Sequence, residues 1–227
     1  MRLGRGNGAE TELPPHEGKR IRQERRGIME YIFWIVFGYL SGSILFAEWL
    51  PKRFCHTDIR AVSEDGNPGT FNVFQQCGAV MGSLVLVLEL GKGFFPVHIA
   101  LQAVDPERWP VALVLAAPVL GHAFPVKNRR SGGKSIAVSF GVLLGLYPVM
   151  LPVLLLAASY LLFSLVMVIG PHSIRSIAAF GTWAAVCCQM PGNAALHLGF
   201  CLIALVVVGK HLVNEWHHPQ RSGRFSR

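Results

Sequence analysis

The sequence is poor in charged residues. Asp, Glu, Lys and Arg make up 15% of the 227 residues, whereas a soluble globular protein carries about 25%. Hydrophobic residues make up 52%, and the charges gather in short stretches, at 1–30, 52–65, 127–134 and in the C-terminal tail, with long apolar segments between them. Because so few polar residues cannot cover the apolar surface of a soluble fold, we expect lipid to be the main solvent of this chain.

Signatures of several other protein classes are missing as well. Cys55, Cys77, Cys187, Cys188 and Cys201 show neither metal-ligand spacing nor the spacing of a secreted disulfide framework, and we interpret them as small buried hydrophobic residues. No metal or other cofactor is expected. The net charge of +8 does not form a basic patch with interleaved aromatic residues. We therefore expect no nucleic-acid partner, and anionic lipid headgroups with an anionic ligand explain the charge better.

Long apolar segments are what the chain has instead. A helix that crosses the hydrocarbon core of a bilayer needs roughly 20 apolar residues. The pattern predicts an all-α integral membrane protein, a bundle of about seven transmembrane helices with short cytoplasmic loops that form the site. The predicted spans, of which the fourth and sixth are short, are 30–50, 79–103, 109–126, 136–148, 149–169, 174–189 and 194–209.

The orientation follows from the distribution of Lys and Arg, which favour cytoplasmic loops. With seven spans, the loops of one side carry only Arg108. The other side, which also holds the C-terminus, is predicted to be cytoplasmic and carries Lys52, Arg53, Arg60, Lys127, Arg129, Arg130, Lys134, Arg175, Lys210, Arg221, Arg224 and Arg227.

The first residues contradict this count, because a basic segment precedes the first span on the predicted outer side. It is polar and rich in Gly, Glu and Arg, which is typical of disorder. Our hypothesis is that residues 1–28 are a disordered basic extension upstream of a natural start at Met29. The alternative is an even number of spans. With Met29 as the start, residues 29–215 are the predicted transmembrane domain, and residues 216–227 are a basic cytoplasmic tail.

Polar residues inside apolar spans are costly and are therefore functional candidates. Ser41, Gly42 and Ser43 stand at the end of the first span, where a small-residue packing face is an equally good interpretation. Further along the chain, the loop 66–72 has glycines suited to positive φ. Such a loop either turns its backbone N–H groups toward an anion or is an ordinary turn.

The third polar group combines two glycines with a lysine in Gly132-Gly133-Lys134, a pattern suited to phosphate recognition. A nucleotide P-loop is rejected because it requires Gly at position 128, which is Asn. Elsewhere, an intramembrane lysine, Lys92, follows Glu89 by three residues, so a structural ion pair is the alternative to a functional role. His211 and Asn214 share one helix face at the end of the last span.

Taken in order, these groups resemble the acyl-phosphate:glycerol-3-phosphate acyltransferase family (PlsY type), from about Tyr31 to Glu215. The matching elements are 42–46 (GSILF), 64–72 (EDGNPGTFN), 89–93 (ELGKG), 122–126 (HAFPV) with 132–134 (GGK), and 211–214 (HLVN). The chain departs from the family pattern where Glu64-Asp65 replaces Gly-Ser and Thr70-Phe71 replaces Ala-Thr. It also has Glu89 for Asp, Ser131 for Lys and Ser135 for Gly, so it resembles a divergent member.

The resemblance implies acyl transfer from a long-chain acyl phosphate to the 1-hydroxyl of glycerol-3-phosphate, giving lysophosphatidic acid and phosphate in a bacterial cell membrane. Membrane lipid and membrane-embedded proteins of phospholipid synthesis would be its partners. None of the 9 histidines is followed by Asp five residues later, as acyl-CoA-dependent acyltransferases require. The alternatives are a transporter of an anionic metabolite and a catalytically silent relative.

The resemblance also implies roles for individual residues. The residues expected to hold the acyl-phosphate head as the catalytic set are Ser43, Arg53, Lys92, His211 and Asn214. Those expected to bind the acceptor are Gly66, Asn67, Gly69, Asn72, His122, Gly132, Gly133 and Lys134. No separate nucleophile or general base is expected, because an acyl phosphate is an activated anhydride whose own phosphate can accept a proton.

Overall fold

The computed structural model describes residues 15–63, 66–129 and 132–217, with side chains from Gly27 to Val213. Every regular element in these ranges is a helix, which confirms the all-α prediction. The helices are α1 (Pro15–Gly42), α2 (Phe46–Phe54), α3 (Ile59–Val62), α4 (Thr70–Ala103), α5 (Val111–Ala123), α6 (Ile136–Leu144), α7 (Leu151–Leu161) with a π-helical turn η1 (Leu162–Val166), α8 (His172–Gln189) and α9 (Ala194–His217).

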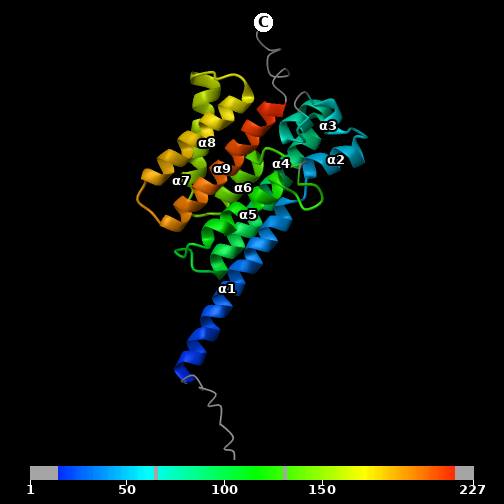
Figure 1. The fold of residues 1–227 in the computed structure, drawn as a ribbon. Coiled ribbons are helices and arrows are strands. Elements are labelled where there is room, and N and C mark those ends of the chain that lie inside the picture. The colour runs from blue at the N-terminus through cyan, green and yellow to red at the C-terminus, as the bar shows by residue number, and fades with distance from the viewer. Residues whose placement is uncertain (1–14, 64–65, 130–131, 218–227) are drawn as a thin grey trace, which may run out of the picture.

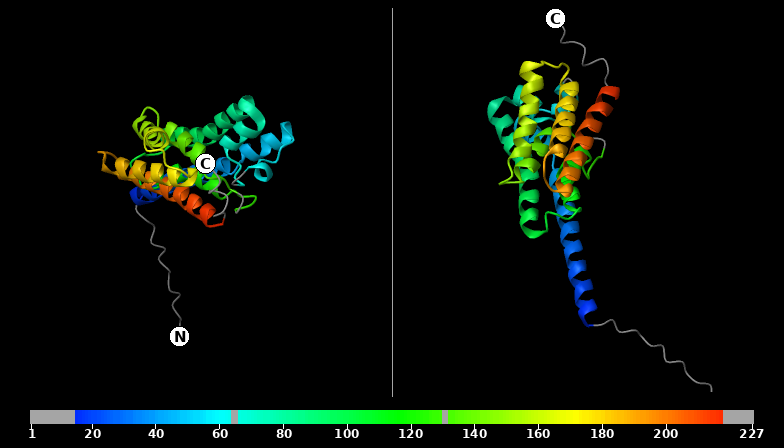
Figure 2. Two further views of the ribbon diagram at one scale, coloured as in Figure 1. Left: turned by 90° about the horizontal axis from the view of Figure 1, so that it is seen from above. Right: turned by 90° about the vertical axis from the view of Figure 1, so that its left-hand side faces the viewer.

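The helices form a bundle around α5, which packs against α1 on one side and α9 on the other (Figure 1). Helix α4 packs against α1 and α6, while α8 lies between α7 and α9. The short helices α2 and α3 lie beside the start of α4, at the same end of the bundle as the end of α9 (Figures 1 and 2). We call this end, with the loop after α5, the site end.

Three helical segments are long and apolar enough to cross a membrane: Gly27–Phe54, Thr70–Ala103 and Ala194–Val213. Two shorter apolar helices, Val111–Ala123 and Leu151–Val166, lie between them in sequence. Large apolar side chains are exposed on the outside of the bundle, including Val80 at 87% and Leu165 at 72%. Such an apolar exterior suits a protein surrounded by lipid.

Each of the seven predicted spans contains a helix, but several boundaries differ, for example that of α9, which continues to His217 instead of ending at 209. Helix α1 ends at Gly42 and a separate helix α2 starts at Phe46, so the first span does not continue to residue 50. Helix α4 consists of two helices joined across a kink at Gly78, whose φ of 79° is not helical. The predicted start at 79 matches the second helix, and the first, at 70–77, was not predicted. The break after α1 and this kink both change the direction of the chain at the site end.

Glycines allow the central helices to approach closely, as expected where van der Waals packing holds membrane helices together. A Cβ atom at Gly42 would overlap the carbonyl oxygen of Pro118, and one at Gly121 would overlap that of Tyr39. These two contacts join α1 and α5. Helices α4 and α6 are joined in the same way, because Gly141 lies directly against the carbonyl oxygen of Leu90.

Helix α1 begins well before the membrane-crossing segment. It extends from the bundle at the end opposite the site end (Figure 2) and includes residues 15–28, for which disorder was expected. Residues of this stretch such as Arg, Lys, Gln and Glu are good helix formers, and they add turns to a helix already nucleated in the bundle. Residues 1–14 of the predicted extension, and 218–227 of the predicted tail, lie outside the described residues.

Candidate functional site

The break between α1 and α2 opens the site end. After Gly42 the backbone leaves the helix, and the Ser43 hydroxyl donates back to the carbonyl oxygen of Tyr39 at 2.8 Å. The next carbonyl, that of Ile44, accepts a hydrogen bond from the Lys92 ammonium at 2.6 Å. The Ser41 hydroxyl also donates to the backbone carbonyl of Lys92 at 2.9 Å. The break is therefore attached to α4 at the position of the intramembrane lysine.

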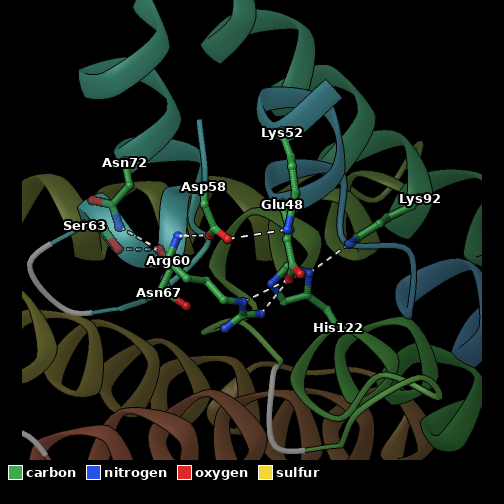
Figure 3. A network of polar contacts seen from close by, with 9 residues as sticks. All are labelled: Glu48, Lys52, Asp58, Arg60, Ser63, Asn67, Asn72, Lys92 and His122. Carbon is green, nitrogen blue, oxygen red and sulfur yellow. Dashed lines mark hydrogen bonds and ion pairs between the residues drawn. The ribbon is translucent and has the colours of Figure 1, made fainter. Parts of the chain in front are cut away.

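Lys92 belongs to a group of three buried ionisable side chains, which we call the buried ion cluster: Glu89, Lys92 and His122. Lys92 Nζ lies 2.8 Å from Glu89 Oε2 and 2.8 Å from His122 Nδ1. His122 Nδ1 is also 3.1 Å from the same carboxylate oxygen. The side chains of the lysine and the glutamate are only 2% and 1% exposed. Figure 3 shows Lys92 and His122 facing each other.

The predicted Glu89–Lys92 ion pair is thus present, and the replacement of Asp by Glu at position 89 keeps it. A buried charge is tolerated only when it is paired and hydrogen-bonded. His122 from α5 completes the arrangement. Sequence reasoning had assigned this histidine to the acceptor and had not linked it to Lys92, which lies thirty positions away in the sequence.

The glycine loop 132–134 lies directly on the C-terminal end of α5. The Gly133 amide donates to the carbonyl oxygen of His122 at 3.1 Å. A Cβ atom at Gly133 would overlap His122 Nε2, and one at Gly132 would overlap the carbonyl oxygen of Ala123. The two glycines are required here for close approach, and Lys134 follows them, half-buried.

Ser135, which replaces a family glycine, adopts a left-handed conformation with φ 62°. Such a conformation strains a residue that carries a Cβ atom. The buried Ser135 side chain offsets part of this cost, because its hydroxyl donates to the carbonyl oxygen of Val119 at 3.1 Å. Its backbone carbonyl accepts from the Ser139 hydroxyl at 2.7 Å.

The loop 66–72 is organised around one carbonyl oxygen, that of Asn67. It accepts from the Gly69 amide at 2.8 Å, from Asn72 Nδ2 at 2.8 Å and from the Ser63 hydroxyl at 3.5 Å (Figure 3). Gly66 has a positive φ of 63°, as its position in a tight turn requires. The predicted glycine turn is therefore present, while Glu64 and Asp65 lie outside the described residues.

Two ion pairs hold α2 and α3 together beside this loop. Arg60 donates to Glu48 Oε2 from Nε at 3.0 Å and from Nη2 at 2.8 Å, and Lys52 Nζ lies 3.5 Å from Asp58 Oδ2 (Figure 3). Sequence reasoning missed Glu48, whose partner is twelve positions away. The only signal was a carboxylate inside an apolar segment.

The remaining predicted site residues have different surroundings. Arg53 is exposed on α2 and lies over the ring of Phe54 at 5.6 Å. Among the described residues, no hydrogen bond or ion pair connects it to the buried ion cluster. His211 is 1% exposed on α9, and Asn214 lies on the same helix beyond the last described side chain.

Lys210, which was counted only for orientation, is a further cation at the site end. Its ammonium lies 5.1 Å from the centre of the Phe124 ring, in the loop that follows α5. In the described ranges, no three His, Cys, Asp or Glu side chains are placed to hold a metal ion. The site end therefore combines buried charges, a glycine loop and several cations, which suits an anionic ligand.

Comparison with known proteins adds an independent finding. The family model described as "Glycerol-3-phosphate acyltransferase" matches residues 32–218. A glycerol-3-phosphate acyltransferase of Pseudomonas paraeruginosa is 35% identical over 182 residues, which cover 79% of this chain and 90% of that protein. One from Maridesulfovibrio salexigens is 42% identical over 122 residues, 53% of this chain and 61% of that protein.

Two solved structures share the fold. Both are crystal structures of PlsY (YgiH), described as an integral membrane glycerol 3-phosphate acyltransferase. The glycerol 3-phosphate form has a TM-score of 0.72 at 28% identity, and the lysophosphatidic acid form has 0.70 at 27%. Each alignment covers 86% of this chain and 95% of the other.

Proposed function

Because the chain belongs to the glycerol-3-phosphate acyltransferase family, we propose that it transfers an acyl group from acyl phosphate to the 1-hydroxyl of glycerol-3-phosphate. The observation that carries the proposal is the similarity, over 86% of the chain, to PlsY structures described as glycerol 3-phosphate and lysophosphatidic acid forms. The glycine loop 132–134 with Lys134 supports an acceptor that carries phosphate.

The proposed reaction needs little from the protein beyond binding and orientation. The acceptor's 1-hydroxyl oxygen bonds to the acyl carbonyl carbon, the bond from that carbon to the phosphate oxygen breaks, and the departing phosphate takes the hydroxyl proton. The products are lysophosphatidic acid and inorganic phosphate. Since the donor is already activated, positioning and electrostatic stabilisation of the phosphate charge supply most of the rate.

The proposed roles follow the sequence pattern. The sequence pattern assigns the donor phosphate to Ser43, Arg53, Lys92, His211 and Asn214, and within this set Lys92 is buried and paired with Glu89. The acceptor is assigned to Gly66, Asn67, Gly69, Asn72, His122, Gly132, Gly133 and Lys134. The hydrogen bonds around the Asn67 carbonyl and the contact of Gly133 with His122 support the acceptor set, because they keep two glycine turns in compact conformations at the site end.

We further propose that the site end and the C-terminus face the cytoplasm of a bacterial cell. Lys52, Arg60, Lys134 and Lys210 lie at the site end, whereas Arg108 follows α4 at the opposite end. A reporter fused after residue 227 tests this orientation. A fluorescent protein that folds only in the cytoplasm should be bright there, and activity of a periplasmic phosphatase reporter would contradict the orientation.

The central test is an assay of the purified protein with palmitoyl phosphate and labelled glycerol-3-phosphate. We expect lysophosphatidic acid and phosphate in equal amounts, and no product when palmitoyl-CoA replaces the acyl phosphate. Product from the thioester alone would contradict the donor assignment. Absence of product from both donors would favour the silent relative, in which case the changes Asp65→Ser and Phe71→Thr test whether the second loop lost the activity.

Two variants separate the proposed donor and acceptor sites. Loss of a charge-assisted contact to phosphate costs about 1.5–3 kcal/mol, or roughly 10- to 150-fold in kcat/KM. Arg53→Ala should raise the KM for acyl phosphate and leave that for glycerol-3-phosphate nearly unchanged. Lys134→Ala should do the reverse. The same shift for both substrates in both variants would contradict the division into two sites.

A further inference from the structure

We infer that Glu89 and Lys92 are positioning residues that act on the acceptor loop 132–134 through His122. Lys92, which the sequence pattern groups with the donor residues, does not bind the donor phosphate directly in this arrangement. The inference rests on the proposed function for its kinetic consequences. It depends on four polar contacts of the buried ion cluster and two backbone contacts of the glycine loop.

Lys92 has a limited hydrogen-bonding capacity. An ammonium group has three N–H donors and no acceptor. Lys92 Nζ forms hydrogen bonds with His122 Nδ1 at 2.8 Å and with the Ile44 carbonyl oxygen at 2.6 Å, and it forms an ion pair with Glu89 Oε2 at 2.8 Å. Two of the three N–H groups are therefore used within the protein, and the charge is already paired. Its side chain is also only 2% exposed, unlike that of a residue presented to a ligand.

His122 contacts the same ammonium through Nδ1. A charged Lys92 ammonium can only donate, so we assign His122 Nδ1 as the acceptor of this contact and place the proton of a neutral imidazole on Nε2. Glu89 Oε2 lies 3.1 Å from the same Nδ1, and by pairing with the lysine it favours the charged ammonium. In this assignment the carboxylate acts on the tautomer through Lys92. The ring is held from one side, with Nε2 directed away from Lys92.

This ring lies against the glycine loop. His122 Nε2 lies where a side chain at position 133 would begin, and the Gly133 amide donates to the His122 carbonyl at 3.1 Å. Ring and backbone of His122 thus form the surface on which the glycine loop rests. A rotation of the imidazole would push the loop away and move Lys134, the next residue.

A test that does not require turnover is nitrogen NMR of protein labelled with ¹⁵N-histidine, with the signal assigned by its loss in His122→Gln. We expect His122 to be neutral with the proton on Nε2 in the wild type, and to lose this preference in Lys92→Met. A proton on Nδ1, or an imidazolium ring, in the wild type would overturn the inference.

Kinetics give the second test. In Lys92→Met the KM for glycerol-3-phosphate should rise about 10- to 100-fold, while that for palmitoyl phosphate stays within about twofold. Glu89→Gln should behave in the same way, and Glu89→Asp, which keeps the carboxylate, should stay near the wild type. Lys127→Met, an exposed lysine close to the same loop, is the matched control. A rise confined to the KM for palmitoyl phosphate would show instead that Lys92 binds the donor.

Equilibrium binding of labelled glycerol-3-phosphate separates the two proposals. If the wild type binds it without transferring an acyl group, the proposed reaction fails, and weaker binding by Lys92→Met still supports the positioning role. If the wild type does not bind it, the proposed acceptor fails, and the NMR result alone decides on the tautomer. Glu89→Asp supplies a folded comparison should Lys92→Met not fold.

A separate observation concerns the opposite end of the bundle. The Sγ atoms of Cys188 and Cys201 lie 3.4 Å apart, on the packed helices α8 and α9. Both residues are exposed, so the expectation that the cysteines are buried was wrong for this pair. Cys188 is the residue before the last in α8. Cys201 is the eighth residue of the membrane-crossing segment Ala194–Val213, so the pair lies within the bilayer near one surface. In the proposed orientation this is the oxidising side of the membrane, where disulfides persist.

The geometry points to Cys188 and Cys201 as a modification site, a dithiol that becomes a disulfide joining α8 to α9. The oxidant is the disulfide of a second protein. Thiol–disulfide exchange reduces that disulfide to a dithiol, which takes up the two electrons and two protons that the Cys188 and Cys201 thiols lose.

The test is to block thiols in intact cells with N-ethylmaleimide and to analyse the purified protein by mass spectrometry. We expect peptides linked through Cys188 and Cys201, while Cys187, which is 2% exposed, stays reduced. Cys188→Ser should lower Tm by about 5 °C, as should a reductant added to the wild type. Complete alkylation of both thiols in the intact cells would overturn the proposal.

Discussion

The site end contains two groups of ion pairs that differ in depth. Glu89 and Lys92 pair at 2.8 Å with side chains that are 1% and 2% exposed. Glu48 and Arg60 pair at the same distance, but their side chains are 37% and 27% exposed. The two pairs have the same distance but different interaction energies, because water screens the charges of Glu48 and Arg60 and is excluded from those of Glu89 and Lys92.

The comparison also separates two kinds of loop. The glycine loop 132–134 rests on backbone and on the His122 ring, so that neither glycine can take a side chain without displacing its support. The loop 66–72 is held by its own hydrogen bonds around Asn67, and Phe71 is 60% exposed, 5.8 Å from the ring of His172. Departures from the family pattern are easier to accommodate in the second loop, where a larger side chain meets little resistance.

The largest expected effect is that of removing one partner of the deeper pair. Glu89→Ala should lower the free energy of unfolding by about 3–5 kcal/mol, because Lys92 is left buried without its counter-charge. Glu48→Ala, the matched change in the shallower pair, should cost about 0–1 kcal/mol. Both values can be measured by reversible unfolding in detergent micelles. Equal losses in the two variants would mean that water reaches the buried ion cluster.

The second effect concerns the glycine loop. Gly133→Ala places a methyl group against His122 Nε2 and should reduce kcat/KM for glycerol-3-phosphate by about 100-fold through displacement of Lys134. Gly181→Ala is the control, since no atom lies within 4 Å of its added Cβ. The measurement is the steady-state assay with palmitoyl phosphate in excess. An unchanged Gly133→Ala enzyme would show that the loop can move without loss.

A smaller effect is expected at Ser135, where φ is 62°. Ser135→Gly removes the strain of about 1–2 kcal/mol and loses one hydrogen bond of about 1 kcal/mol, so its stability should stay within about 1 kcal/mol of the wild type. Ser135→Ala keeps the strain and loses the hydrogen bond. It should therefore be less stable than Ser135→Gly by about 1–2 kcal/mol. The measurement is thermal unfolding of the wild type and the two variants. A Ser135→Ala protein as stable as Ser135→Gly would show that the conformation at position 135 is not strained.

The smallest effect is expected from removal of residues 1–28, of which the described part, 15–28, lies away from both ion pairs. Expression from Met29 removes the basic segment and the helical turns at 15–28, which extend beyond the bundle (Figure 2). We expect unchanged insertion, Tm and turnover. A truncated protein that fails to insert, or that loses activity, would show that residues 1–28 contribute to folding or function.

Apolar segment length determined most of the fold from the sequence. The hydrocarbon core of a bilayer offers no hydrogen-bond partners for backbone N–H and C=O groups. Each apolar segment must therefore form these hydrogen bonds within itself, and an α-helix does so. The break at 43–45 and the early start of α4 could not be predicted in this way. They depend on the hydrogen bond that the Ile44 carbonyl accepts from Lys92 and on the positive φ of Gly78, neither of which apolar content encodes.

For the site, the sequence alone indicated the candidate elements: the glycines at 132 and 133, the lysines at 92 and 134, and the ordered pattern typical of the family. Only the tertiary structure decided how they are connected. It placed His122 against Lys92, and the glycine loop against His122. It left Arg53 exposed on α2. The physical reason is that burial and hydrogen-bond saturation are properties of the packed bundle, where the contacts of one ammonium group come from three separate segments of the chain.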